Sequence, residues 1–157
     1  MVASVTLCHL AEHPELLSRL QVWFESEWPS WYGMAGRGNA EQDLQSYSNR
    51  GTVPVGLVAL RGSRLCGVAA LKSEAFPSHP QLSPWVGAAL VEPSLRRQGI
   101  GRRLLEGLES EARILGYRKV YCATGTATSL LERSHWQLLE RVEHEGQQVS
   151  VYERSLT

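Results

Sequence analysis

The sequence predicts a mixed α/β fold in a single domain that covers residues 1–157. Apolar patterns typical of strands and helices follow one another in the order β-α-α-β-β-β-α-β-α-β-β, with no internal repeat and no linker-like stretch. A chain of 157 residues, of which 43% are hydrophobic and 20% charged, is long enough to enclose one hydrophobic core. Glycine and proline occur at ordinary levels, as in globular proteins.

The expected strands are short apolar runs. They cover residues 2–10, 53–60, 65–72, 85–91, 119–123, 136–143 and 148–153. The second and third runs are separated by Arg61-Gly62-Ser63-Arg64, which predicts a β-hairpin. The run 85–91 is stopped by Glu92-Pro93, and a turn at Glu145-Gly146 joins the last two strands.

The expected helices have apolar residues at helical spacing or helix-start signals. They cover residues 14–27, 40–48, 100–115 and 129–133. Pro14 suits the first turn of the first helix, and Gly116 closes the third in the left-handed conformation. The Gly-rich, aromatic segment 29–39 is an expected loop, mobile enough to act as a lid or substrate wall, and 73–83 is an expected irregular loop.

Charge and cysteine usage exclude several classes of protein. Sixteen basic residues balance sixteen acidic ones, which argues against nucleic acid or an anionic membrane as partner. Three isolated cysteines among apolar residues are interpreted as free thiols in a reducing compartment. With no run of 18 apolar residues and no signal-peptide pattern, the expected location is cytoplasmic.

One stretch of the sequence matches the spacing of a zinc-binding motif. His9-Leu10-Ala11-Glu12-His13 matches His-x-x-Glu-His, which needs both histidines on one face of a continuous helix. Pro14 disfavours helical geometry at His13, so the motif falls across a strand-to-helix junction. We therefore expect no metal site.

The stretch from Arg96 to Arg103 carries two glycines between two arginine pairs, where a strand gives way to a helix. The first amides of a helix lack intrahelical partners, and glycine lets the backbone approach an anion closely. The helix dipole adds about half a positive charge there. These features predict a phosphate site, although a loop glycine pair before a helix with a solvated basic face explains the spacing equally well.

Two other phosphate loops do not match this stretch. A dinucleotide fingerprint requires glycine at position 104, which is leucine, and no Gly-Lys-Ser/Thr occurs in the chain.

The residues Arg96-Arg97-Gln98-Gly99-Ile100-Gly101 match the Arg/Gln-x-x-Gly-x-Gly/Ala motif of the GNAT (Gcn5-related N-acetyltransferase) superfamily. Val91-Glu92-Pro93 precedes the motif at the usual distance, and the helix after it ends in a common form, Glu111 to Tyr117. Ser83-Pro84-Trp85 and the terminal strand pair also resemble one bacterial branch of the superfamily. The chain therefore resembles a GNAT acyl-CoA N-acyltransferase over most of its length.

This resemblance implies that acetyl-CoA binds between two splayed parallel strands, residues 85–91 and 119–123. The amides of Arg97, Gly99, Gly101 and Arg102 would hold the pyrophosphate, with the other motif residues, Arg96, Gln98 and Ile100, in the same turn. The backbone of Val91 would pair with the pantetheine arm. The amide of Ala89 would face the thioester oxygen.

The implied activity is direct transfer of acetyl to a primary amine of a small molecule or peptide. The thiolate's proton donor in the superfamily is often a tyrosine, but Leu131 stands at that position and His135 stands where glycine is expected. Ser134, His135 or Tyr121 are alternative acids.

The candidate bases are the carboxylates and the histidine near the expected acceptor site: Glu25, Glu27, Glu74, His79 and Glu92. We select Glu74, Glu92 and Ser134 as the catalytic candidates.

Two other functions stay open at this point. An acyl-CoA-binding regulatory or catalytically degenerate domain is suggested by Leu131. A nucleic-acid-binding module at the basic helix start is disfavoured by zero net charge. The resemblance also implies a possible homodimer through the terminal strands.

Overall fold

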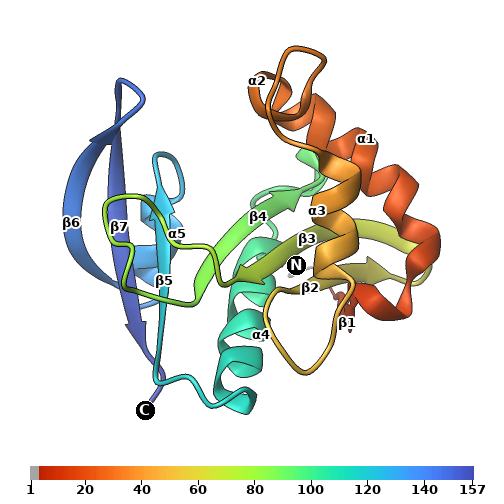
Figure 1. Ribbon diagram of the computed structural model, residues 1–157. Coiled ribbons are helices and arrows are strands. Elements are labelled where there is room, and N and C mark those ends of the chain that lie inside the picture. The colour runs from red at the N-terminus through yellow and green to blue at the C-terminus, as the bar shows by residue number, and fades with distance from the viewer. Residues whose placement is uncertain (1–3) are drawn as a thin grey trace.

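A computed structural model describes residues 4–157, so the first two positions of the expected strand 2–10 lie outside the described residues. Seven strands form one sheet in the order β1-β2-β3-β4-β5-β7-β6 (Figure 1). The strands are β1 (Thr6–His9), β2 (Val55–Arg61), β3 (Arg64–Lys72), β4 (Trp85–Val91), β5 (Lys119–Thr124), β6 (Gln137–His144) and β7 (Gln147–Ser155). The helices are α1 (Leu17–Glu27), α2 (Pro29–Tyr32), α3 (Ala40–Tyr47), α4 (Ile100–Ile114) and α5 (Thr128–Arg133). The predicted mixed α/β fold is confirmed, and the element order matches the prediction except for the additional helix α2.

The N-terminal third differs from the prediction in three details. Among the described residues of the expected strand 2–10, β1 begins only at Thr6 and ends at His9, because Leu10 starts a 3₁₀ turn. Residues 14–16 form a 3₁₀ turn, so the α-helix begins at Leu17 rather than at Pro14. The expected loop 29–39 begins with the short helix α2, whose first residue is Pro29. Proline suits a first helical turn because that position needs no backbone donor. The rim of the molecule above β4 therefore carries helical structure where a loop was expected (Figure 1).

Helices cover both faces of the strands β2 and β3. Leu57 and Ala69 face a core cluster that includes Leu104 and Leu108 of α4. The adjacent residues Val58, Val68 and Ala70 belong to a second cluster with α1 and α3, which contains Leu20, Phe24 and Leu44. Because both faces are buried, these strands are continuous apolar runs rather than alternating ones.

The centre of the sheet opens between β4 and β5, its only parallel pair among residues 4–157. These strands pair in register only at Trp85–Tyr121 and Val86–Cys122. Figure 1 shows them diverging toward their C-terminal ends, with α5 beside β5 and α1 to α3 on the other side of the opening. The predicted splay of the two strands is therefore present. Each helix in the described part of the chain is too short or too polar to span a membrane.

Candidate active site

A bulge in β4 starts the opening between the strands. Leu90 pairs with Val68 and Gly87 pairs with Ala70, so two residues, Ala88 and Ala89, lie opposite a single residue of β3. Ala88 has a positive φ of 52°, which is uncommon for a residue with a Cβ. An extra residue bends the bulged strand. The C-terminal half of β4 consequently turns away from β5.

The bulge also leaves backbone groups of β4 facing the opening. The amide of Glu92 donates to the carbonyl of Cys66 in β3 at 3.0 Å. Because successive residues of a strand direct their backbone groups to opposite sides, those of Val91 point toward β5. Ala89, which belongs to the bulge, also lines the opening. In agreement, the Val91 carbonyl accepts a hydrogen bond from Arg96 Nε at 3.0 Å, on the side away from β3. This edge can therefore pair with an extended ligand.

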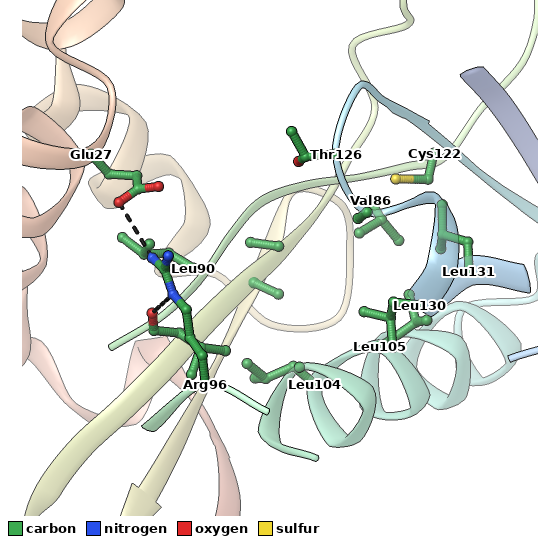
Figure 2. Close-up of a pocket in the computed structure, with 15 residues that line it drawn as sticks. Glu27, Val86, Leu90, Arg96, Leu104, Leu105, Cys122, Thr126, Leu130 and Leu131 are labelled. Carbon is green, nitrogen blue, oxygen red and sulfur yellow. Dashed lines mark hydrogen bonds and ion pairs between the residues drawn. The ribbon is translucent and has the colours of Figure 1, made fainter. Parts of the chain in front are cut away.

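The opening contains a cavity of about 310 Å³, which we call the strand gap (Figure 2). Its apolar walls come from four elements: Val86 of β4, Cys122 of β5, Leu104 and Leu105 of α4, and Leu130 and Leu131 of α5. Glu27 and Arg96 lie at the other end of the cavity in Figure 2. Burial raises the pKa of the Cys122 thiol to about 12, so this wall is uncharged at neutral pH.

A second cavity of about 720 Å³ lies at the start of α4, and we call it the helix-start groove. Gly99 is the N-cap and has a φ of 87°, a left-handed conformation in which a Cβ is strained. The first helical hydrogen bond runs from the Arg103 amide to the Gly99 carbonyl at 3.1 Å. Within residues 4–157, the amides from Arg97 to Arg102 have no backbone partner, so they are free to bind an anion.

The two cavities are adjacent and share four lining residues. Both are lined by Val91, Arg96, Gly101 and Leu130. A Cβ added to Gly101 would lie 3.7 Å from Leu130 Cδ2 and 3.9 Å from Val91 Cγ2, which are ordinary contact distances. The protein itself therefore has room for a side chain here, and the bare backbone leaves space for a ligand at the junction of the two cavities.

The structure brings most of the predicted cofactor-binding residues together. Those that line one or both cavities are Ala89, Val91, Arg96, Arg97, Gly99, Ile100, Gly101 and Arg102. Gln98 lines neither cavity, and its Oε1 accepts from Arg61 Nη2 at 3.5 Å.

The three predicted catalytic residues lie outside both cavities. Glu74 is exposed in the loop before β4. Glu92 accepts a hydrogen bond from Arg64 at 2.9 Å. Ser134 is buried at the C-terminal end of α5, and its Oγ has no hydrogen-bond partner among residues 4–157. Their catalytic roles stay predictions.

Glu27 is the carboxylate that lines the strand gap. It ends α1, and one of its oxygens lies 3.4 Å from Arg96 Nη2. In the sequence it is one of several acidic residues near an aromatic segment, and no local pattern distinguishes it from Glu25. Only the packing of α1 against the end of β4 places it at the gap.

The two departures from the superfamily pattern, Leu131 in place of tyrosine and His135 in place of glycine, both lie at the end of α5. The amide of Trp136 donates to Leu131 at 2.9 Å and that of His135 to Glu132 at 3.1 Å, the two bonds of a Schellman motif. This motif needs a positive φ at its centre, and His135 has a φ of 68°. Histidine thus occupies a glycine-favouring position, while Leu131 is only 2% exposed and forms part of the cavity wall.

The His-x-x-Glu-His motif is split as expected. His9 ends β1 and His13 lies between two 3₁₀ turns, and His9 Nε2 is 2.7 Å from Glu111 Oε1 of α4. Across residues 4–157, no group of three or more His, Cys, Asp or Glu side chains is arranged to hold a metal ion.

Residues 18–134 match the family model described as the acetyltransferase (GNAT) family. The match covers more than half of the chain and includes β4, β5 and the helix start of α4. The chain therefore belongs to the GNAT acetyltransferase family. No curated protein matches it in sequence.

Solved structures show the same fold. An aminoglycoside 6'-N-acetyltransferase complexed with coenzyme A has 14% identity and a TM-score of 0.78, over 97% of both chains. The aminoglycoside 6'-N-acetyltransferase from Enterococcus faecium has 15% identity and a TM-score of 0.75, again over 97% of both chains. The Salmonella typhimurium protein yncA, solved with its cofactor acetyl-CoA, has 15% identity and a TM-score of 0.73, over 99% of this chain and 95% of its own. The predicted GNAT fold is confirmed.

Proposed function

We propose that this protein is an acetyl-CoA-dependent N-acetyltransferase that acts on a primary amine of a small molecule or peptide. The observation that carries this proposal is that the two cavities adjoin, sharing the lining residues Val91, Arg96, Gly101 and Leu130. A groove lined by free amides and arginines suits a pyrophosphate. A narrow gap beside an unpaired strand edge suits the extended pantetheine arm. One ligand of the CoA type fits both.

The chain's own residues supply distinct parts of this site. The amides of Arg97, Gly99, Gly101 and Arg102 would bind the pyrophosphate, and the backbone of Val91 would pair with the pantetheine arm. The amide of Ala89 would donate to the thioester oxygen as negative charge develops there. Bound acetyl-CoA supplies the activated acetyl thioester.

In the transfer, the amine nitrogen bonds to the carbonyl carbon, the carbon–sulfur bond breaks and the sulfur leaves as a thiolate. The nitrogen loses a proton, for which Glu27, the carboxylate that lines the strand gap, is the candidate acceptor. The need for a base depends on the amine. A lysine-like amine with a pKa of about 10.4 is neutral in only about one part in a thousand at pH 7.4, whereas an α-amino group with a pKa of about 7.7–8.0 is neutral in about one part in three to five.

The proton for the thiolate has no donor at the usual place, since Leu131 cannot provide one. A thiol with a pKa of about 8.5 is a tolerable leaving group without an acid, so transfer remains feasible at a reduced rate. Leu131 also favours a second candidate function, an acyl-CoA-binding domain without turnover.

A panel of amines separates these functions. It should contain aminoglycosides, because two similar structures are aminoglycoside 6'-N-acetyltransferases, together with polyamines, lysine and short peptides. We expect acetyl-CoA to raise Tm and at least one amine to accelerate release of free CoA thiol above the rate without amine. A rise in Tm with no release by any amine would support the binding domain, and no change in Tm would contradict both functions.

A further inference from the structure

The strand gap ends where β4 and β5 come together, at the register pair Val86–Cys122. Leu105 of α4 and Leu131 of α5 complete this end, which we call the closed end. In Figure 2 these residues lie opposite Glu27 and Arg96. The cavity therefore has a charged end near the C-terminal end of β4 and an apolar end near the start of this strand.

The closed end contains no side chain that is charged at neutral pH. Leu105 and Leu131 are 5% and 2% exposed, and burial keeps the Cys122 thiol protonated by raising its pKa to about 12. The hydroxyl nearest in the lining belongs to Thr126, whose residue is exposed to solvent. An apolar group that enters this end would leave water without leaving a polar partner unsatisfied.

The closed end also lies beyond the place of the reacting carbonyl. In the proposed function, the amide of Ala89 faces the thioester oxygen, and Val86 is three residues earlier in the same strand. At about 3.3 Å per residue, this is roughly 7–10 Å further into the gap. An acetyl group ends in one methyl and would occupy little of that distance.

We propose that the closed end binds the alkyl tail of acyl groups longer than acetyl, so that the protein transfers short unbranched acyl groups, such as propionyl and butyryl, from their CoA thioesters. This inference rests on the proposed function. The bonds made and broken are the same: the amine nitrogen bonds to the acyl carbon, the sulfur leaves, and the amine proton passes to a base. Only the apolar tail differs.

Binding of four ligands to the intact chain tests this inference by calorimetric titration. CoA, acetyl-CoA and butyryl-CoA vary the tail, and succinyl-CoA has four carbons in its acyl group but ends in a carboxylate. A buried methylene contributes about a fourfold gain in affinity, equivalent to about 0.8 kcal/mol. We expect butyryl-CoA to bind as tightly as acetyl-CoA or up to about tenfold more tightly, and succinyl-CoA to bind at least about tenfold more weakly than butyryl-CoA.

The outcomes are distinguishable. If CoA and acetyl-CoA bind but butyryl-CoA binds more than about threefold more weakly than acetyl-CoA, the longer-chain inference is wrong and the proposed function stands. Equal binding of succinyl-CoA and butyryl-CoA would also overturn it, because an apolar end should reject a carboxylate. If CoA itself does not bind, both proposals fail.

A substitution at the closed end tests whether the alkyl tail binds there. Val86→Phe adds bulk at the closed end. It should weaken the binding of butyryl-CoA by at least about tenfold and change the affinity for CoA by less than about threefold. The matched control is Val22→Phe, the same change at a residue of α1 that is 60% exposed and outside the strand gap. If Val86→Phe leaves the butyryl-CoA affinity unchanged, the tail lies elsewhere and the inference is wrong. Unfolding midpoints of both variants establish that each is folded.

Discussion

The carboxylate of Glu27 lies 3.4 Å from the guanidinium of Arg96, although 69 positions separate the two residues. The same arginine donates through Nε to the Val91 carbonyl at 3.0 Å. These contacts connect the end of α1 to the strand edge that faces the gap. A ligand that pairs with the Val91 carbonyl would therefore lie beside Arg96 and close to Glu27.

Glu27→Gln should lower kcat/KM for an amine acceptor by about tenfold or more, because the amide cannot accept the amine proton. Acetyl-CoA affinity should change by less than about threefold. Glu25→Gln is the matched control, since Glu25 is on the same helix, accepts from Gln21 at 3.2 Å and does not line the strand gap. Equal kinetics for the two variants would exclude Glu27 as the base.

Gly101→Ala should weaken acetyl-CoA binding without lowering the stability of the protein. The added Cβ meets only ordinary contacts in the protein, and alanine is favoured over glycine in a helix by about 0.5–1 kcal/mol. We therefore expect an unchanged or higher Tm, with acetyl-CoA binding weakened by about tenfold because the methyl group enters the ligand's space. Titration calorimetry and thermal unfolding measure the two quantities.

The control for Gly101→Ala is Gly107→Ala on the same helix. Its Cβ would lie 2.7 Å from Leu7 Cδ1 and 2.9 Å from Leu57 Cδ1, so these side chains must shift and Tm should fall. Acetyl-CoA affinity should remain that of the unchanged chain. If Gly101→Ala leaves acetyl-CoA affinity unchanged, the pyrophosphate does not lie against this turn.

Glu109 joins α4 to β7 and to the segment after α5. The residue is 6% exposed, and its carboxylate accepts from Trp136 Nε1 at 3.2 Å and from Arg154 Nε at 3.4 Å. Glu109→Leu leaves both donors without that partner and should lower the free energy of unfolding by about 2–4 kcal/mol. Glu106→Leu, at an exposed residue of the same helix, should change it by less than about 0.5 kcal/mol. Urea unfolding measures both, and similar values for the two variants would contradict a structural role for the Glu109 contacts.

Stability should fall as the pH rises above about 8.5. Burial raises the pKa of Cys122 to about 12 in the folded protein, whereas an exposed thiol has a pKa of about 8.5. Between these values the folded state holds a proton that the unfolded state has lost. The contribution of Cys122 to the free energy of unfolding is therefore complete below the pKa of the thiol in the unfolded state. It is lost as the pH rises toward the pKa in the folded state, by up to about 1.4 kcal/mol per pH unit.

Urea unfolding at pH 8, 9.5 and 10.5 measures this loss. Cys122→Ala should show a shallower decline than the unchanged chain, because the variant has no thiol to titrate. Burial and the hydrogen bond to Asp43 also raise the pKa of Tyr32, so a decline above pH 10 should persist in the variant. Identical slopes in the two proteins over pH 8 to 9.5 would show that the Cys122 thiol does not contribute.

The helix-start groove could be predicted from the sequence because it depends on neighbouring residues. Gly99 adopts the left-handed conformation that glycine favours, and the amides that follow are free because every helix start leaves its first donors unpaired. His135 illustrates the limit of such prediction. The sequence shows a departure from the superfamily pattern there, but only its φ of 68° shows that the helix-ending geometry is retained.

The sequence by itself determined the strands, the longer helices and the glycine turn before α4, since hydrophobic periodicity and glycine placement act over a few residues. Only the tertiary structure decided which side chains share the strand gap. It placed Glu27 beside Arg96, left Glu74, Glu92 and Ser134 outside, and made Leu131 and Cys122 an apolar end wall. The physical reason is that a cavity is bounded by elements far apart in the chain, so its lining depends on how helices pack against the sheet.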